Sequence, residues 1–427
     1  MTDIIHELRW RGLIHQTTDD AHIGEWLNAG SRTLYAGFDP TADSLHVGHL
    51  MAVMILRRFQ QAGHRPIALV GGATGMIGDP SGKSDERNLL SIEVLQANVA
   101  AMETQMRRFL DFSPGPKGAL LVNNFDWMRG YTYLDFLRDV GKNFPVNVML
   151  AKDSVKSRLE RSDAGMSYTE FSYMLLQGYD FVHLNQEFGC ELQVGGSDQW
   201  GNITAGIDLA RRMKGVQLYG MTCPLLTKSD GGKMGKTERG AVWLSPERTS
   251  PYQFYQYWIN LDDADAGLCL RMLTELPLEQ VEALDAARAA DPAKRESQRR
   301  LAEALTLLVH GDDGLNAAWR ATEIFFGAEI GVLDDAQLGE IFADVPSREL
   351  PRARLDGSGL NIQDALVEAG LAKSKSDARR TVEQGGAYVN NRRIEAIATQ
   401  LTAAHLASET VMVLRSGKKK YALLRFR

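Results

Sequence analysis

The sequence predicts an α/β domain with a parallel sheet, followed by a helical domain and a small α+β domain. Apolar runs alternate with helical patterns up to about residue 227, and the pattern is almost entirely helical from Pro251 to about Phe326. Residues 360–427 then return to a mixture of helices and strands. Strands that alternate with helices favour a parallel sheet covered on both faces. Such sheets bind ligands beyond the carboxyl ends of their strands.

The elements of the first part follow from the spacing of apolar side chains, which is helical in some segments and forms short runs in others. Helices are expected at 4–16, 46–61, 92–111, 130–142, 147–160 and 168–187, and after Ser197. Strands are expected at 32–39, 66–72, 119–124, 190–196 and 222–227.

The later part of the chain divides by composition. Residues 328–358 contain glycine, proline and isolated charges, which predicts a loosely structured connector. The segment after it has the pattern of two helices followed by three strands. The expected division is a first domain over 1–226, a helical domain over 227–327, a linker over 328–358 and a last domain over 359–427.

The composition is that of an ordinary globular protein. Of 427 residues, 44% are hydrophobic and 24% are charged, which argues against disorder and against a coiled coil. No apolar run approaches the roughly 20 residues that span a bilayer, and the first residues lack the apolar stretch of a signal peptide. Cys190, Cys223 and Cys269 have the spacing of neither a disulfide framework nor a zinc site. We therefore expect a cytoplasmic protein with no membrane partner.

Charge is unevenly distributed along the chain. Residues 351–427 carry 14 Lys and Arg against 7 Asp and Glu, which leaves 34 against 47 in residues 1–350. A basic tail on an acidic body favours a polyanionic partner for the tail. A solvated basic surface is the alternative interpretation.

The first motif with chemical meaning is His46-Val47-Gly48-His49, at the start of an expected helix. Two histidines three residues apart share one helix face, and the exposed N–H groups of a helix start favour a phosphate. Gly48 leaves room for a nucleobase or a ribose to approach. Histidines that cap the helix or bind a metal are the alternative.

The second motif is Lys233-Met234-Gly235-Lys236-Thr237, in a segment rich in glycine and lysine. The glycines predict a flexible loop. The lysines suit a triphosphate whose charge moves onto leaving pyrophosphate in the transition state. A solvated surface loop is the alternative.

Two glycine-rich loops, at 71–82 and 195–201, match neither common nucleotide fingerprint. The first loop lacks the glycine spacing of G-x-G-x-x-G, and Gly78 lies one residue too late for a P-loop that ends in Lys83-Ser84. A P-loop hydrolase and a dehydrogenase are therefore disfavoured.

Together the two motifs resemble the paired HIGH and KMSKS signatures of the class I aminoacyl-tRNA synthetases, whose catalytic domain is Rossmann-like. The chain is similar over essentially its whole length to the bacterial tyrosyl-tRNA synthetases. The similarity lies in YAGFDPTADSLHVGH, GDPSGKSDER, EFSYMLLQGYD, QVGGSDQWGN and KMGKT, and in a tail like the S-four-type RNA-binding domain. The departures are valine for isoleucine in the first signature, and Gly235 and Thr237 for the two serines of the second.

The resemblance implies a tyrosine site. Its residues would be Tyr35, Asp79, Tyr173, Gln177, Asp180, Gln193 and Gln199. Tyr35 and Asp180 would meet the phenolic hydroxyl, and phenylalanine would leave both polar groups unpaired. Tyr173, Gln177 and Asp79 would hold the ammonium group. A structural role for these buried polar residues is the alternative.

The resemblance also implies an ATP site and a catalytic set. The ATP-binding residues would be Gly37, Asp39, Thr41, Gly48, Lys83, Arg87, Gly196, Asp198 and Lys236. The catalytic residues would be His46, His49, Lys233, Lys236 and Thr237. The two histidines would donate to ATP oxygens, and the loop residues would clamp pyrophosphate.

The activity implied is that of a tyrosine–tRNA ligase. The carboxylate of L-tyrosine attacks the α-phosphorus of ATP and releases pyrophosphate, and a ribose hydroxyl at the 3′ end of tRNA-Tyr then takes the tyrosyl group. No protein nucleophile is needed, so catalysis would depend on positioning and on charge stabilisation. ATP would be a substrate and would bring Mg²⁺ with it, and no protein-bound metal or organic cofactor is expected.

The basic tail would bind the tRNA. Its candidate phosphate contacts are Lys373, Lys375, Arg379, Arg380, Arg392 and Arg393. Contacts of this kind give salt-dependent affinity and little sequence discrimination. The resemblance also implies a homodimer, with apolar side chains between 125 and 150 as candidates for the interface.

Three other functions remain open on the sequence alone. Tryptophanyl-tRNA synthetase shares the catalytic fold, but Tyr35, Asp180 and the basic tail argue against it. A nucleotidyltransferase with the same two signatures would make a small-molecule adenylate and would not need tRNA. The third is an RNA-binding protein whose synthetase body has lost its activity. The sequence favours the tyrosine–tRNA ligase.

Overall fold

The chain folds into two compact units. The computed structural model describes residues 3–81, 90–152, 155–156, 159, 166–237, 240–331, 333–343 and 345–427. The first unit comprises Met1–Thr249 and Tyr257–Val309, and the second comprises Ser250–Gln256 and His310–Arg427. No helix among the described residues is long and apolar enough to cross a membrane.

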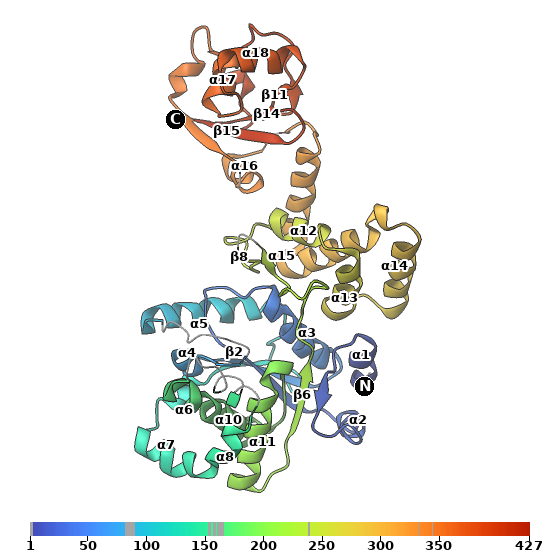
Figure 1. The fold of residues 1–427 in the computed structure, drawn as a ribbon, viewed down its shortest axis with the longest axis vertical. Coiled ribbons are helices and arrows are strands. Elements are labelled where there is room, and N and C mark those ends of the chain that lie inside the picture. The colour runs from blue at the N-terminus through green and yellow to red at the C-terminus, as the bar shows by residue number, and fades with distance from the viewer. Residues whose placement is uncertain are drawn as a thin grey trace. The chain divides into compact units, whose positions relative to one another are not determined.

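The first unit contains a six-stranded sheet in the order β1-β6-β5-β2-β3-β4 (Figure 1). The strands are β1 (Gln16–Thr17), β2 (Thr33–Phe38), β3 (Arg65–Val70), β4 (Leu120–Asn123), β5 (Cys190–Gly196) and β6 (Tyr219–Cys223). All neighbours are parallel except β1, which runs antiparallel to β6. The strand order reverses direction between β2 and β5, so the carboxyl ends of these two strands flank the switch point at which such sheets bind ligands.

Helices cover both faces of this sheet, which confirms the predicted α/β class. One core lies between the sheet and two helices, α10 (Tyr168–Phe188) and α11 (Trp200–Lys214). It contains Tyr35, Ile67 and Leu69 from the strands and Phe181 and Leu209 from the helices. Helix α3 (Val47–Gln61) packs against β2, β3 and β5. Figure 1 shows α3 on one side of the sheet and α10 and α11 on the other.

Most helices lie where the periodicity predicts them, but several are shorter. The remaining helices around the sheet are α1 (Ile4–Trp10), α2 (Ile23–Asn28), α4 (Thr74–Ile77), α5 (Ile92–Met106), α6 (Phe125–Met128), α7 (Tyr133–Asp139) and α8 (Val146–Leu150). The first helix ends six residues before its predicted end at 16. Gly12 follows it with φ +71°, a conformation that ends a helix.

Helices follow the sheet, as predicted. The KMGKT segment forms a small hairpin of β7 (Lys236–Thr237) and β8 (Gly240–Ala241). The helices after it are α12 (Pro251–Ile259), α13 (Asp263–Leu273), α14 (Leu278–Ala290) and α15 (Glu296–Phe325). Gly311 interrupts α15 with φ +71°, close to the boundary between the two units. The domain limits predicted at 226, 327 and 358 stay predictions.

The second unit contains a five-stranded sheet in the order β12-β11-β14-β15-β9 and a small β10-β13 pair. Its strands are β9 (Ser347–Leu350), β10 (Leu360–Asn361), β11 (Ala387–Val389), β12 (Arg392–Arg393), β13 (Gln400–Leu401), β14 (Val411–Ser416) and β15 (Lys420–Phe426). Helices α17 (Ile362–Glu368) and α18 (Lys375–Glu383) share a core with β11, β14 and β15. The predicted order of two helices followed by strands is present.

Residues 328–358 differ from the loose connector that their composition predicts. They include α16 (Asp335–Ile341) and β9, which extends the sheet by pairing parallel to β15. Ile330, Leu338 and Phe342 are buried in one core with Val411 and Leu423. Their apolar side chains cover the second face of the sheet, so this segment is part of the folded unit.

Candidate active site

The candidate site lies at the carboxyl ends of β2 and β5. Tyr35 and Gln193 are paired in register on these strands and are 0% and 2% exposed. The Tyr35 hydroxyl and the Gln193 Oε1 atom have no hydrogen-bond partner among the described residues. Gln177, on α10, contributes a third such atom, its Oε1. A buried polar atom without a partner costs free energy, and substrate sites are where such atoms are expected.

Asp180, on α10, is held by two hydrogen-bond donors. Its carboxylate accepts from Asn124 Nδ2 at 3.0 Å and from Trp127 Nε1 at 2.9 Å. Burial raises its pKa to about 7, against the lowering effect of these two hydrogen bonds. Burial, and then the charge of Asp180, raises the pKa of Tyr35 far above its ordinary value, so the Tyr35 phenol keeps its proton.

The sequence analysis did not identify Asn124 or Trp127. Asn124 directly follows β4, so it lies at the same carboxyl edge as the rest of the site. That position is a signal that could have found it. Trp127 lies on the short α6, and nothing in its local sequence marks it as a partner of Asp180.

The residues predicted for the ammonium group form a connected chain. Gln199 Nε2 donates to Asp79 Oδ2 at 2.7 Å, and Gln177 Nε2 donates to Gln199 Oε1 at 3.2 Å. Asn202, on α11, donates to Gln199 Oε1 and to Ser81 Oγ, both at 3.3 Å. The structure therefore brings Asp79, Gln177 and Gln199 together and adds Asn202, which the sequence analysis missed.

Tyr173 and Asp39, which were predicted for two different ligands, are directly bonded. The Tyr173 hydroxyl donates to Asp39 Oδ2 at 2.9 Å, and Thr74 donates to Asp39 Oδ1 at 2.8 Å. A Cβ on Gly71 would lie 2.3 Å from both Asp39 and Thr74, so only glycine fits there. The predicted amino-acid and nucleotide subsites thus adjoin at the end of β2.

Four more residues predicted for ATP lie near the ends of β2 and β5, namely Gly37, Thr41, Gly196 and Asp198. Gly37 lies near the end of β2, and Thr41 donates its N–H to the Asp39 carbonyl at 2.9 Å. A Cβ on Gly196 would lie 2.6 Å from Asp198 Oδ1. Burial, and then the charge of Asp79, raises the pKa of Asp198. Lys83 and Arg87 lie outside the described residues.

His46 and His49 form the start of α3. His46 is the N-cap, and its Nδ1 accepts the Gly48 N–H at 3.0 Å. His49 Nδ1 accepts the His46 N–H at 3.2 Å, and the two rings stack with centroids 3.9 Å apart. Burial lowers the pKa of His46, with a smaller contribution from the charge of Lys236. A neutral His46 whose Nδ1 accepts must carry its proton on Nε2. The capping interpretation is therefore correct, and it leaves Nε2 as a donor.

The residues that follow the KMGKT segment are hydrogen-bonded to the start of α3, and Gly235 of the segment packs against it. Val47 donates its N–H to Val242 O at 3.0 Å, and Leu244 donates to Leu45 O at 2.8 Å. Gly235 has φ +78°, and a Cβ there would lie 2.6 Å from the Cβ of Val47. Val47 and Gly235, both departures from the generic signatures, therefore contact each other. Met234 is buried, which distinguishes the segment from a fully solvated loop.

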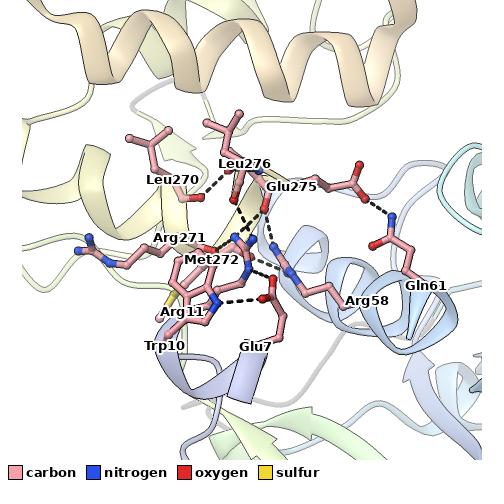
Figure 2. Close-up of polar contacts among 11 residues, drawn as sticks. Glu7, Trp10, Arg11, Arg58, Gln61, Leu270, Arg271, Met272, Glu275 and Leu276 are labelled. Atoms are coloured by element: carbon pink, nitrogen blue, oxygen red, sulfur yellow. Dashed lines mark hydrogen bonds and ion pairs between the residues drawn. The ribbon is translucent and has the colours of Figure 1, made fainter. Parts of the chain in front are cut away.

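Two buried arginines join α1 and α3 to the end of α13 within the first unit (Figure 2). Arg11 of α1 and Arg58 of α3 are 3% and 4% exposed, and Glu7 accepts from Arg11. The acceptors at the end of α13 are the carbonyl oxygens of Arg271, Met272, Thr274 and Leu276, at 2.6–3.0 Å. This two-arginine clamp satisfies carbonyls that a helix end leaves unpaired. It connects the far end of α3 to α13, and the sequence analysis did not predict it.

The predicted RNA contacts lie on the surface of the second unit, and several are ion-paired. The pairs are Lys375 with Asp364, Arg379 with Glu383, Arg380 with Asp377, and Arg392 with Glu329. Lys373 is exposed at the start of α18, and Arg393 lies against Gly385. Exposed pairs contribute little to stability, so these cations can exchange their partners for phosphates.

Comparison with known proteins defines the class of this site. Residues 28–327 match the family model of the class I tRNA synthetases (W and Y). Residues 337–424 match that of the tyrosine–tRNA ligase SYY-like C-terminal domain. The parallel sheet with its two signature segments is thus that of a class I tRNA synthetase.

Individual relatives narrow the class. The chain is 62% identical to the tyrosine–tRNA ligase of Rhodopirellula baltica, over 99% of this chain and 96% of that one. A truncated mitochondrial tyrosyl-tRNA synthetase of Aspergillus nidulans matches 76% of this chain and 95% of its own, with a TM-score of 0.69 and 31% identity. The chain belongs to the tyrosine–tRNA ligase family.

The tryptophan alternative is related to the chain by fold alone. Tryptophanyl-tRNA synthetase of Plasmodium falciparum covers 79% of this chain with a TM-score of 0.54, at 14% identity. The predicted family is therefore confirmed, and the alternative functions are not favoured.

Proposed function

We propose that this tyrosine–tRNA ligase binds L-tyrosine between Tyr35, Gln177 and Gln193 and activates it there with ATP. The observation that supports this assignment is the set of three buried polar atoms without partners. One is a hydroxyl that suits a phenol, and the other two are amide oxygens that suit an ammonium group. All three belong to residues that the sequence predicts for tyrosine.

The phenol of the substrate is recognised by Asp180 and Tyr35. The ionised carboxylate accepts the phenolic proton, while Asn124 and Trp127 fix its orientation. Side chains held in this way need no rearrangement on binding, which favours discrimination. Phenylalanine would leave both buried groups unpaired. At the other end of the substrate, Asp79 faces the ammonium group. Gln199 donates a hydrogen bond to the Asp79 carboxylate.

The two signature segments stabilise the negative charge that develops on ATP during the reaction. His46 donates from Nε2 to a phosphate oxygen and remains neutral while it does so. Lys233, Lys236 and Thr237 surround the departing pyrophosphate, with Lys236 close enough to His46 to influence its pKa. Stabilising charge where it develops is the main catalytic contribution open to a site without a nucleophile. Mg²⁺ enters with ATP as part of the substrate.

The experiment that tests this proposal is exchange of labelled pyrophosphate into ATP, with each of the twenty amino acids and without tRNA. We expect exchange with tyrosine alone. Exchange with tryptophan would keep the fold and refute the roles of Tyr35 and Asp180. No exchange with any amino acid would refute activation at this site.

The second unit binds tRNA-Tyr through its basic surface. The charge excess of residues 351–427 and the exposed cations on α18 and β12 support this assignment. Removing residues 328–427 should abolish tRNA charging and leave tyrosine-dependent exchange intact. A cut at 351 is less suitable, because Ile330, Leu338 and Phe342 would lose the strands that bury them. Loss of both activities in the shorter chain would argue against separate modules.

The enzyme forms a homodimer through an apolar surface on the first unit. Its exposed side chains are Tyr133, Leu134, Val146, Val148, Leu150 and Tyr168, on α7, α8 and α10. The hydroxyls of Tyr133 and Tyr168 are 3.5 Å apart, which joins the two ends of this surface. Exposed apolar residues that cluster in this way mark interfaces. Sedimentation should show a dimer, and Leu134→Glu should give a monomer. A monomeric unaltered chain would refute the assignment.

The enzyme works in the cytoplasm. Cys190, Cys223 and Cys269 are free and buried, which suits a reducing compartment.

A further inference from the structure

The KMGKT loop turns at glycines whose backbone conformation other residues rarely adopt. Gly231, Gly235 and Gly240 have φ of +84°, +78° and +110°. Within the loop, Lys228 donates its N–H to Gly232 O at 2.8 Å, and β7 pairs with β8. These bonds shape the hairpin, and Val242, which donates to Gly235 O and accepts from Val47 N, ties its end to α3. The turn that carries Lys233 and Lys236 depends on further contacts. Contacts with other segments must therefore position its lysines.

The Tyr257 hydroxyl, from α12, bonds the centre of the loop. It accepts the Gly235 N–H at 2.7 Å and donates to Met234 Sδ at 3.1 Å. Burial raises the pKa of Tyr257 to about 12, so the hydroxyl keeps the proton that it donates. Both contacts fall between Lys233 and Lys236. The bond to Gly235 thus holds the residue that packs against Val47 at the start of α3.

Helix α13, which begins six residues after Tyr257, is anchored both to the loop and to α3. Asp265, buried at the start of α13, accepts the Ser229 N–H at the beginning of the loop, at 2.8 Å. The other end of α13 is held by Arg58 of α3 and Arg11 of α1 in the two-arginine clamp (Figure 2). These contacts connect α3 to α13, α13 to the loop, and the loop to Val47 at the start of α3. Tyr257 therefore bonds the loop from the helix that directly precedes this anchored α13.

We propose that Tyr257 is a positioning residue that holds the KMGKT loop against the start of α3, so that Lys233 and Lys236 meet the phosphates of ATP. This inference depends on the proposed roles of those lysines in tyrosine activation. Tyr257 touches neither substrate nor reacting atoms. It acts through the main chain of Gly235 and the side chain of Met234.

The test is Tyr257→Phe, with Tyr219→Phe as the matched control. The Tyr219 ring packs on Trp26 at an angle of 33°, and its hydroxyl makes no hydrogen bond within the part of the chain that the structure describes. Loss of the hydroxyl removes both of its contacts and should slow adenylate formation about three- to tenfold at saturating tyrosine and ATP. Tyrosine affinity should be unchanged, because the Tyr257 hydroxyl bonds Gly235 and Met234 and none of the residues proposed to bind tyrosine. Transfer from preformed tyrosyl-adenylate to tRNA should also be unchanged, because pyrophosphate has already left.

Single-turnover kinetics of each step separates positioning from general damage. Slower activation alone in Tyr257→Phe, with Tyr219→Phe like the unaltered enzyme, supports the inference. An unchanged activation rate would overturn it, and so would an equal loss in tyrosine binding, activation and transfer. Absence of tyrosine-dependent exchange in the unaltered enzyme would instead refute the proposed function itself.

Discussion

In the proposed tyrosine site the functional side chains lie on the sheet and α10 and are buried, whereas the lysines proposed for pyrophosphate lie among glycine turns of the KMGKT loop and are exposed. Tyr35, Asp180 and Gln193 are at most 2% exposed. Lys233 and Lys236 lie on the surface. The contrast follows from the two tasks. Recognising one hydroxyl on a ring requires fixed partners, whereas handling pyrophosphate requires cations that can follow a moving charge.

Removing the fixed charge should have the largest effect. Asp180→Asn places an amide between two donors, Asn124 and Trp127, so that one of them loses its acceptor. We expect kcat/KM for tyrosine in pyrophosphate exchange to fall about 100-fold or more. The preference for tyrosine over phenylalanine should shrink, because the phenol loses its charged acceptor. Asp208→Asn, at a half-exposed position paired with Arg211, is the control. An unchanged preference would show that Asp180 does not recognise the phenol.

Removing a loop cation should slow one step and spare binding. Lys236→Ala deletes a charge proposed to face pyrophosphate, and losing one such contact in the transition state costs about 100-fold in rate. Stopped-flow measurement should show slow adenylate formation with nearly unchanged tyrosine affinity. Lys214→Ala, at the exposed end of α11, is the control. Equal activation rates in the Lys236 variant and the unaltered enzyme would rule out that role.

The difference between the two regions also explains what the sequence could predict. The parallel sheet follows from alternating patterns, and Tyr35, Gln193 and Asp79 are polar residues in or just after apolar runs. Residue type and pattern alone did not select them. The family resemblance identified these residues and supplied their expected roles.

The supporting contacts could not be predicted in the same way. Trp127 meets Asp180 53 positions away, and Arg11 meets carbonyls more than 250 positions away. No local pattern encodes such pairs, because they exist only once distant segments pack. The buried segment around Phe342 was missed for the same reason. The ion pairs within α18 are different, because Arg379–Glu383 and Arg380–Asp377 have the i,i+4 and i,i+3 spacing that a helix brings together.

Restoring the generic serine to the loop should have a smaller effect than removing its lysine. Gly235→Ser places a side chain at φ +78° and 2.6 Å from Val47 Cβ. The backbone strain alone costs about 1–2 kcal/mol, so we expect activation to slow about tenfold or more with tyrosine affinity unchanged. Gly231→Ser has similar strain, with no atom within 4 Å of the new Cβ. If both variants slow activation equally, the contact with Val47 does not matter.

The smallest expected effect is a dependence of tyrosine affinity on pH. The pKa of Asp180 in the free enzyme is about 7 because the carboxylate is buried. Since the phenol donates to the ionised form, affinity should rise as pH rises through 7, by about tenfold between pH 6 and pH 8. Calorimetry on the unaltered enzyme and on Asp180→Asn checks this, because free tyrosine titrates identically in both. A flat profile in the unaltered enzyme would show that Asp180 is already ionised at pH 6.

The same pKa makes the opposite prediction for the stability of the free enzyme. Between the ordinary value of 3.8 and about 7, the folded state keeps a proton on Asp180 that the unfolded chain has lost. The contribution of this residue to the free energy of unfolding therefore falls as pH rises across that range. Asp180→Asn should remove this slope in denaturant titrations. Ionisation of Asp180 should therefore lower the stability of the free enzyme and raise its affinity for tyrosine. The lysines of the loop are exposed, so their charge does not carry this cost of burial.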